Sequence, residues 1–512
     1  MKKVLLFLLS TIVLFSVVGC KPAASPSSSE IDRETVEQSM PENTLQLWIE
    51  SGKNAEFIGF GTEIDPQFIQ YNVGRTGRNS DGSTWTCRLS DWEDVFVPRI
   101  REMNLKRIRV MLLPSWFATS ESVYQNGTYT FDSDGWKSLE LVLDTAQKFD
   151  MYVNITMWGI DGGAQWMGEP LISGQWITVP KSNEVFCNVF ADALEYLIDE
   201  KGYTCIKEVT PYNEPDTVFR PYLGEVKGFP AYAELCYKLN DVFEERGLRD
   251  RLKFNLGDDA NRASWLESSA LELSEIADYF NSHNYKFGKN TSNSDMLGNQ
   301  ISGAFGTFQQ ALGDSNVPLM YGEFGTNTTQ PPNGCVDRYE PSRGIDVTRI
   351  AINALNSGAV GLSYWVLFSQ FYSTSTDFSD IMSMGLWGFA DENYECRPVY
   401  YAYSLLTRFT EMGSTIYPIS AGDENIAAVA LRTAEGKWTY LMVNTSDVAV
   451  QVSFGNVVSE VGDLAYYAYS SNDTYAEGKQ IESEGTFKSA DQVTTLAIPG
   501  NTLVVLTEQD HD

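Results

Sequence analysis

Two glutamates in this sequence each stand at the end of a short apolar run. Glu214 lies within residues 210–215 (Thr-Pro-Tyr-Asn-Glu-Pro), and Glu323 lies within residues 321–325 (Tyr-Gly-Glu-Phe-Gly). Two carboxyl groups that meet can share acid–base work, because one donates a proton to a leaving oxygen while the other attacks a carbon atom or activates water. Burial beside a second carboxylate raises the pKa of one of them, which keeps it protonated near neutral pH. This chemistry requires a fold that brings the two glutamates together.

An alternation of strand and helix patterns, repeated eight times, surrounds these glutamates. The strand candidates are mostly continuous apolar runs, which is typical of parallel strands that are covered on both faces. Eight such units between residues 54 and 412 predict a protein of the α/β class, a (β/α)₈ TIM barrel. A doubly wound open sheet is the alternative, but no strand candidate is followed by a glycine-rich phosphate loop. The strand candidates are 57–62, 107–112, 151–156, 205–210, 252–256, 278–283, 317–322 and 360–365, and the helix candidates are 89–103, 135–149, 184–200, 230–245, 264–276, 296–312, 344–357 and 398–411.

The carboxyl ends of the strands carry the active site in barrels of this kind. Glu214 follows the fourth strand candidate and Glu323 the seventh, so the two are expected to face each other across the barrel mouth. Two carboxyl groups placed in this way are what hydrolysis of a glycosidic bond needs. Asp258 and Asp259 follow the fifth strand candidate and are expected to cap the next helix, with binding of a substrate hydroxyl as the alternative.

The rest of the chain, residues 413–512, consists of short strand candidates separated by turn residues. This pattern predicts a small all-β sandwich on the C-terminal side of the barrel. Residues 44–50, ahead of the first barrel strand, are a further strand candidate that would pair back onto the sandwich. The strand candidates of the sandwich are 426–432, 438–444, 448–454, 465–469 and 494–507.

The chain of 512 residues is acidic and rich in aromatic side chains, which restricts its ligands. It has 68 Asp and Glu against 37 Lys and Arg, a net charge of −31, which argues against nucleic acid or an anionic lipid surface as a partner. His283 and His511 are its only histidines and no Cys-x-x-Cys pair occurs, so we expect neither a metal nor an organic cofactor. Aromatic residues make up 13% of the chain, which favours a neutral, hydroxylated ligand.

The amino-terminal residues have the pattern of an export signal. Two lysines precede an apolar run over residues 4–18, which is too short to span a bilayer as a stable helix. The run ends in Val-Val-Gly-Cys, which resembles the lipobox of bacterial lipoproteins and makes Cys20 the lipidated residue; an ordinary signal peptide cut nearby is the alternative. We therefore expect a signal peptide over 1–19 and a flexible tether over 20–43. The protein would be exported by the general route to the bacterial cell envelope and touch the membrane only through its lipid.

The motif around the two glutamates resembles clan A of the glycoside hydrolases, the retaining (β/α)₈ enzymes. It consists of Asn-Glu-Pro at residues 213–215 after strand four and Glu323 after strand seven, and the resemblance covers the whole predicted barrel. The resemblance implies that Glu214 is the acid/base, that Glu323 is the nucleophile and that Asn213 holds the sugar 2-hydroxyl.

Within this clan the sequence looks most like family 30. The Gly-Phe-Gly of residues 59–61, the β-strand before it and the C-terminal sandwich carry this likeness. Families 39 and 5 are the alternatives, and the Thr-Glu-Ile of residues 62–64 matches no single family.

Further positions at the strand ends match the clan, and each has a structural alternative. Arg109 in strand two looks like the arginine that orients the nucleophile, with a structural ion pair as the alternative. His283 and Tyr285 match a His-x-Tyr pattern after strand six, and Trp365 matches the tryptophan under the reacting sugar; core packing is the alternative for His283 and Trp365. The tryptophans in predicted loops that are candidates for stacking on sugar faces are Trp116, Trp158, Trp166 and Trp387.

Together these observations predict a retaining β-glycoside hydrolase that acts on an oligo- or polysaccharide by double displacement. The two carboxyl groups are then expected about 5–5.5 Å apart. A transglycosylase with the same residues and a non-catalytic glycan-binding surface lipoprotein on a degenerate barrel are the alternatives. The predicted loops 125–134, 161–180 and 369–395 are long enough to shape the sugar specificity.

Overall fold

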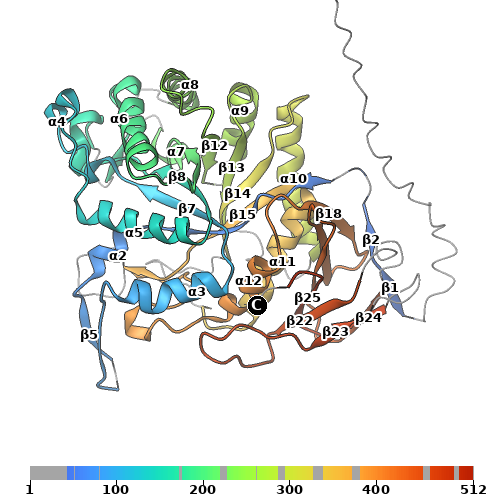
Figure 1. The fold of residues 1–512 in the computed structure, drawn as a ribbon. Helices are drawn as coiled ribbons and strands as arrows, with labels where there is room; N and C mark the ends of the chain where they lie inside the picture. The colour runs from blue at the N-terminus through green and yellow to red at the C-terminus, as the bar shows by residue number, and fades with distance from the viewer. Residues whose placement is uncertain are drawn as a thin grey trace, which may run out of the picture. The chain divides into compact units, whose positions relative to one another are not determined.

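The barrel strands are short segments that are buried almost throughout. They are β4 (Gly59–Ile64), β7 (Arg107–Leu112), β8 (Tyr152–Met157), β11 (Ile206–Thr210), β12 (Lys253–Asp259), β13 (Tyr279–Asn284), β14 (Leu319–Phe324) and β15 (Ala359–Tyr364). In the computed structural model these eight parallel strands close into a barrel in chain order, and β15 pairs with β4 (Figure 1). The predicted (β/α)₈ fold is confirmed, and each predicted strand lies within about three residues of an observed one.

The structure describes residues 43–510, except for 51, 53, 80, 172–175, 220–227, 261, 286–293, 327–337, 372–380, 454–461 and 489–494. The predicted signal peptide, Cys20 and the tether as far as residue 42 therefore lie outside the described residues, as do parts of the predicted loops 161–180 and 369–395. Among the helices that the structure describes, none combines the length and the apolar character needed to cross a membrane.

A helix follows every barrel strand, as the alternation predicts. Serine side chains begin two of these helices, since Ser133 Oγ accepts from the backbone N–H of Trp136 and Ser182 Oγ accepts from that of Val185. The candidates 89–103 and 184–200 each contain a five-residue π-helical segment, Trp92–Phe96 and Tyr196–Glu200. The helices are α3 (Val97–Glu102), α5 (Asp134–Lys148), α6 (Asn183–Glu195), α8 (Phe229–Glu245), α9 (Ala263–Leu273), α10 (Ser294–Leu312), α11 (Ser342–Ser357) and α12 (Pro398–Arg408).

Short elements are inserted into the loops that follow the strands, on the side of the barrel where the predicted site lies. They add walls around the barrel mouth. They are α2 (Gln67–Asn72), β5 (Thr76–Arg78) and β6 (Thr84–Thr86) after β4; Pro114–Trp116 and α4 (Glu121–Asn126) after β7; β9 (Ile160–Asp161), Gly162–Met167 and β10 (Ile177–Thr178) after β8; α7 (Pro215–Val218) after β11; and β16 (Gln370–Phe371), β17 (Ile381–Met382) and Ala390–Glu392 after β15.

Three barrel strands extend two or three residues further than the apolar pattern predicts. β4 extends to Ile64, β12 extends to Asp259 and β14 extends to Phe324. Glu63, Asp258 and Glu323 consequently lie within strands, where the apolar pattern breaks off because the side chains are carboxylic acids although they are buried. The mouth of the barrel therefore has a charged interior that composition patterns alone do not reveal.

The C-terminal region forms two sheets. The larger has the strand order β2-β18-β19-β20-β25-β22-β23, with β3 also paired to β18, and the smaller is β1-β21-β24. The single strand expected over 494–507 is wrong, because the turn at Pro499 to Asn501 divides it between the two sheets. Three of these strands, β3, β18 and β23, were not predicted. The strands are β1 (Thr44–Gln46), β2 (Trp48–Ile49), β3 (Ala55–Glu56), β18 (Thr415–Ser420), β19 (Ile426–Arg432), β20 (Trp438–Asn444), β21 (Val450–Ser453), β22 (Leu464–Ser470), β23 (Gly485–Phe487), β24 (Thr495–Ile498) and β25 (Thr502–Thr507).

This sandwich packs against the helix that follows the seventh barrel strand. Asn356 near the end of α11 donates to the carbonyl of Ala428 in β19 at 2.8 Å. Tyr469 in β22 donates to the carbonyl of Pro341 at 2.7 Å. Its ring also packs against Gly344, where an ideal Cβ would lie only 2.7 Å from a ring carbon. The sandwich therefore braces the side of the barrel that carries Glu323.

Candidate active site

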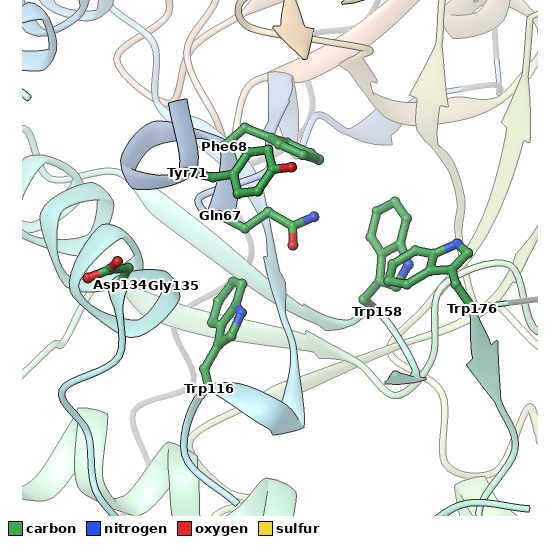
Figure 2. Close-up of a pocket in the computed structure, with 8 residues that line it drawn as sticks. All are labelled: Gln67, Phe68, Tyr71, Trp116, Asp134, Gly135, Trp158 and Trp176. Carbon is green, nitrogen blue, oxygen red and sulfur yellow. The ribbon is translucent and has the colours of Figure 1, made fainter. Parts of the chain in front are cut away.

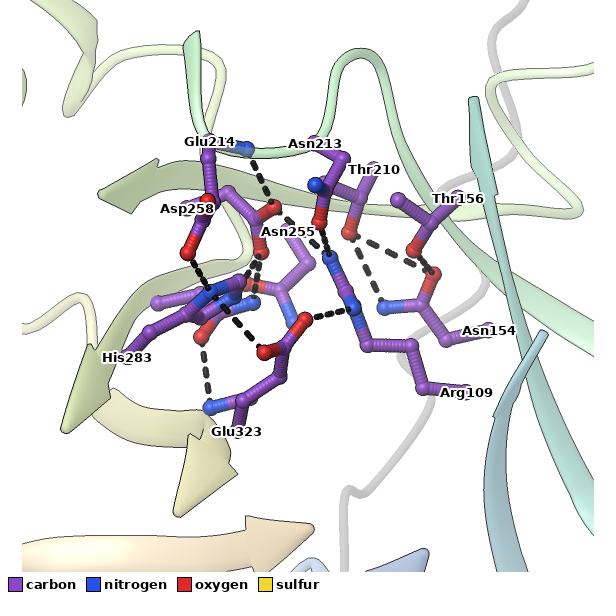
Figure 3. Close-up of polar contacts among 12 residues, drawn as sticks. Arg109, Asn154, Thr156, Thr210, Asn213, Glu214, Asn255, Asp258, His283 and Glu323 are labelled. Atoms are coloured by element: carbon purple, nitrogen blue, oxygen red, sulfur yellow. Dashed lines mark hydrogen bonds and ion pairs between the residues drawn. The ribbon is translucent and has the colours of Figure 1, made fainter. Parts of the chain in front are cut away.

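Arg109, in the middle of β7, lies at the centre of the polar cluster in the barrel mouth (Figure 3). Its Nη1 donates to Glu323 at 2.7 Å and also to Glu63. Its Nη2 donates to Asp258 at 2.7 Å and to the side-chain oxygen of Asn213 at 2.8 Å. The side chain is 2% exposed, so this single guanidinium balances three buried carboxyl groups from β4, β12 and β14.

His283, in β13, connects the two glutamates that the sequence singles out. Its Nδ1 lies 3.1 Å from Oε1 of Glu214 and 3.4 Å from Oε2 of Glu323, and its Nε2 lies 3.1 Å from Oδ1 of Asp258. Burial lowers the pKa of His283, but the carboxylates of Glu323 and Asp258 outweigh burial and raise it well above its usual value. The ring is therefore an imidazolium that donates from both nitrogens.

Glu214 and Glu323 meet across the barrel mouth. One carboxylate oxygen of each and one ring nitrogen of His283 all lie within 4.8 Å of one another. Glu214 follows β11 in a left-handed conformation (φ 43°), and its backbone N–H donates to Asp258 at 3.2 Å. Its side chain is 31% exposed, whereas that of Glu323 is 7% exposed. Glu214 is thus open to the mouth while Glu323 forms part of its floor.

Glu323 receives hydrogen bonds from several directions. Arg109 donates to Oε1, and Tyr285 donates its hydroxyl hydrogen to Oε2. Burial raises the pKa of Glu323 above its usual value, because His283 and Arg109 oppose this rise only in part and the neighbouring Glu214 adds to it. These donors orient both oxygens of Glu323 and favour its ionised form.

Glu63 is a site residue that the sequence analysis left without a role. It is fully buried in β4 and shares Nη1 of Arg109 with Glu323. Burial raises its pKa well above the usual value, because Arg109 offsets this only in part and Glu323 and Asp65 raise the pKa further. Glu63 is therefore the member of the pair that holds a proton. Its only sequence signal is a glutamate inside an apolar strand.

We expect the substitution Glu63→Gln to reduce kcat/KM by less than about tenfold, because a neutral amide oxygen can accept from Arg109 as the protonated carboxyl does. Glu323→Gln serves as the comparison, since it removes an ionised group and is expected to abolish turnover. Steady-state kinetics at pH 7 on one substrate would compare the two. A loss at Glu63→Gln as large as at Glu323→Gln would show that Glu63 works as an anion.

Asp258 is not a helix cap, which corrects one expectation. It lies in β12 with φ 48°, accepts from Arg109, His283 and the side chain of Asn281, and is fully buried. Burial raises its pKa, but Arg109 and His283 more than compensate and the net pKa is lowered. Asp258 therefore holds a permanent negative charge beneath both glutamates. The strand was predicted to end at 256, so this position was not recognised as inward-facing.

Asp259, the next residue, does serve the start of α9, since its Oδ1 accepts from the backbone N–H of Arg262. Its other carboxylate oxygen, Oδ2, is buried. Burial raises the pKa of Asp259 from 3.8 to about 7, although the Arg262 N–H opposes the rise. Ionising this carboxyl in the folded protein is therefore unfavourable.

A pH-dependent stability follows from Asp259. Because its folded pKa of about 7 exceeds the unfolded value, the unfolded chain loses this proton first, and stability falls as pH rises from about 4 to 7. Asp259→Asn is expected to make this fall in stability shallower, by on the order of 4 kcal/mol at most, because the titrating carboxyl group is gone. The amide oxygen still accepts from the N–H of Arg262, so the start of α9 is kept. Urea unfolding of both proteins at pH 5 and pH 8 measures the effect. Equal pH dependence in both would contradict a raised pKa at this position.

The predicted tryptophans separate into two groups. Trp365 packs with Val366 and Met384, and Trp158 and Tyr285 pack against this cluster. Trp116 lies across the mouth and lines a cavity together with Trp158. The other two are not sugar-facing candidates, because Trp387 is fully buried against Phe96 and Tyr400, and Trp166 stacks on Tyr124 and donates to the carbonyl of Ala118.

Glu214, His283 and Glu323 are residue types that ligate metals, so a cation site must be considered. Both nitrogens of His283 face carboxylate oxygens and carry protons, whereas a ligating histidine has to offer a lone pair. Arg109 also occupies one oxygen of Glu323. This donor set suits proton transfer better than cation binding.

A second polar layer, which starts from Arg107 at the beginning of β7 and Glu208 in β11, lies deeper in the barrel and supports the first. Glu208 accepts from Arg107 at 2.6 Å, from Asn154 at 2.6 Å and from Asn255 at 2.8 Å. Arg107 and Glu208 are almost completely buried, so this ion pair fills the barrel with hydrogen-bonded groups rather than with an apolar plug. These hydrogen bonds support the polar cluster around Arg109 from below.

Comparison with solved structures connects this geometry to known proteins. The catalytic domain of a family 30 xylanase C from Talaromyces cellulolyticus has a TM-score of 0.62 at 13% identity, covering 90% of this chain and 99% of that chain. An endo-β-1,6-glucanase has a TM-score of 0.60 at 14% identity, covering 92% and 95%. A family 51 α-L-arabinofuranosidase from Thermotoga petrophila has a TM-score of 0.60 at 12% identity, covering 91% and 100%. No protein-family model and no curated protein matches the sequence. The chain shares the fold of clan A glycoside hydrolases, as its motifs predicted.

Proposed function

We propose that this protein is a retaining glycoside hydrolase in which Glu323 is the nucleophile and Glu214 is the acid/base. The observation that supports this most strongly is the approach of Glu214 and Glu323 to within 4.8 Å through His283. Retaining enzymes hold their carboxyl groups about 5–5.5 Å apart, whereas inverting enzymes need about 6.5–9.5 Å to admit a water molecule.

In the first step, Glu323 attacks the anomeric carbon while Glu214 transfers its proton to the departing glycosidic oxygen. The C–O bond to the leaving group breaks, and an ester bond forms between the sugar and Glu323. The hydrogen bonds from Arg109 and Tyr285 to Glu323 hold its oxygens in line for this attack. Glu214 is the more exposed of the pair, which suits a group that must meet the leaving sugar.

In the second step, Glu214, now ionised, removes a proton from water, and the resulting hydroxide breaks the ester. His283 contacts both glutamates and stabilises the negative charge as it moves between them. Asn213 has its side-chain oxygen fixed by Arg109, so its amide N–H groups are the ones available to a sugar 2-hydroxyl. Trp365, with Trp158 beside it, provides the apolar surface under the reacting sugar.

The proposed substrate is a neutral oligo- or polysaccharide with β-linked sugars. The neighbours named as xylanase and β-1,6-glucanase support this class, and the acidic character of the chain, −31 overall, disfavours polyanions. Anchoring through a lipid on Cys20 at the bacterial cell envelope, with export by the general route, is part of the same proposal and rests on the sequence pattern alone.

A substrate screen tests this proposal. The chain from residue 21 onward is incubated with aryl β-xylosides and β-glucosides, an aryl α-L-arabinofuranoside, xylan and β-1,6-glucan, and the anomer that is formed first is followed by NMR. We expect one substrate to be cleaved with retention, and Glu214→Gln and Glu323→Gln to lose this activity. Inversion would reject the mechanism. Glycan binding without cleavage would support the capture-protein alternative, and transfer to an added acceptor sugar in place of water would support a transglycosylase.

A further inference from the structure

A cavity of about 610 Å³ lies beside the reacting centre and is walled mainly by aromatic rings. Its walls come from the loops after three neighbouring barrel strands, β4, β7 and β8. Its volume lies within the range of sites that hold drug-sized ligands. Figure 2 shows the lining residues, which are Gln67, Phe68, Tyr71, Trp116, Asp134, Gly135, Trp158 and Trp176.

Trp158 separates the cavity from the catalytic mouth and contacts both. This side chain lines the cavity and also packs against the cluster of Trp365, which includes Tyr285 at its edge. Tyr285 in turn donates to the carboxylate of Glu323. A ligand in the cavity would therefore lie next to the sugar that Glu323 attacks.

Large aromatic surfaces are left open in this cavity. Trp176 is 49% exposed and packs against Trp158 in a tilted arrangement with ring centroids 5.5 Å apart, and Tyr71 is 41% exposed. The indole of Trp116 packs directly against Gly135 of α5. A side chain at this position would collide with the indole, because an ideal Cβ would lie 2.4 Å from its nitrogen. Exposed aromatic surface at a concave site marks a place where another molecule binds.

The polar groups among these rings match hydroxyl groups rather than charges. The amide of Gln67 points into the space between Trp116 and Trp158 (Figure 2), where it offers a donor and an acceptor. The one charged residue in the lining is Asp134, and neither Lys nor Arg is among the lining residues that the structure describes. Asp134 disfavours a carboxylate on the ligand. The guanidinium of Arg75 lies over the ring of Tyr71, 5.0 Å from its centroid, at the edge of this lining.

We propose that this cavity is an additional sugar subsite that binds neutral pyranose rings next to the one being cleaved, so that the enzyme prefers oligosaccharides to single-sugar glycosides. The apolar faces of the sugar rings stack on Trp158, Trp176 and Tyr71, and their hydroxyls meet Gln67 and Asp134. This inference rests on the proposed function and names the substrate class of the same site.

The test compares aryl glycosides that carry one, two or three units of the sugar identified by the screen. In the wild type, kcat/KM is expected to rise with chain length. Trp176→Ala and Tyr71→Ala are each expected to reduce the ratio of kcat/KM on the three-sugar substrate to that on the one-sugar substrate by about 5- to 30-fold. Tyr237→Ala is the matched control, since Tyr237 is 38% exposed on α8 outside the cavity, and it should leave the ratio unchanged.

A binding measurement separates this inference from the proposed function. Titration of Glu323→Gln with neutral xylo- and β-1,6-gluco-hexasaccharides, followed by tryptophan fluorescence, should show binding that Trp176→Ala weakens, and oligogalacturonate should bind more weakly. If the wild type cleaves nothing in the screen, such binding would support the subsite and reject the hydrolase. Cleavage without any dependence on chain length, equal losses on short and long substrates, or preferred binding of oligogalacturonate would overturn the subsite and leave the hydrolase standing.

Discussion

Removal of the Glu323 carboxyl group is expected to reduce hydrolysis by a factor on the order of 10⁴ or more, because no other group can attack the anomeric carbon from that side. The fold should survive Glu323→Ala, since Arg109 keeps its contacts with Glu63, Asp258 and Asn213. Glu435→Ala, in an exposed turn of the sandwich, is the control and should have full activity.

Added azide identifies which glutamate is the nucleophile. In Glu323→Ala, azide takes the vacated position and attacks an aryl glycoside directly, so the glycosyl azide has the inverted configuration. In Glu214→Ala, azide instead breaks the ester on Glu323, so the product has the retained configuration. NMR of the two products decides the assignment. The opposite pairing would exchange the roles of Glu214 and Glu323, and full activity of either variant without azide would reject the site.

Loss of the Arg109 guanidinium is expected to have the largest effect on stability. Arg109→Met removes the cation that contacts Glu63, Asp258 and Glu323, all nearly inaccessible to water. The imidazolium of His283 then has to balance the two carboxylates of Asp258 and Glu323 alone. Uncompensated buried charge of this kind costs about 3–5 kcal/mol. Arg109→Lys should restore only part of this, because one ammonium group cannot reach four acceptors on two sides.

Chemical unfolding of the variants at pH 7 measures the loss, with Arg101→Met as the control, because Arg101 is 65% exposed and its ion pair is worth little. Adding Glu63→Gln to Arg109→Met is expected to recover little of the loss, because Glu63 already carries a proton in the wild type. Large recovery by Glu63→Gln would show that Glu63 is ionised. A loss below about 1 kcal/mol in Arg109→Met would mean that the carboxyl groups are not charged as described.

The order of elements in the barrel was predictable from local pattern. Strands such as β15 are largely apolar runs, and helices such as α6 begin with a serine cap, so both properties can be recognised from neighbouring residues. The Asn-Glu-Pro motif and Glu323 were recognisable for the same reason, because each follows a strand whose end can be located. The chain-order closure of the barrel then brings strands four and seven to one mouth.

Burial of charge was not predictable in this way. Glu63 and Asp258 interrupt apolar strands, and a pattern method ends the strand or assigns a cap at such residues. They are tolerated inside only because Arg109 and His283, far away in sequence, lie against them. The aromatic cavity was unpredictable for the same reason, since Tyr71, Trp116 and Trp176 come from three separate loops and meet only in the folded protein.

The sequence by itself thus determined the fold class, the two glutamates and most of their partners, because these depend on short-range pattern and on strand order. Only the tertiary structure decided the electrostatics of the carboxyl cluster and the composition of the aromatic cavity. Both depend on which side chains meet across the barrel, where desolvation and charge–charge distance set the pKa of each carboxyl group.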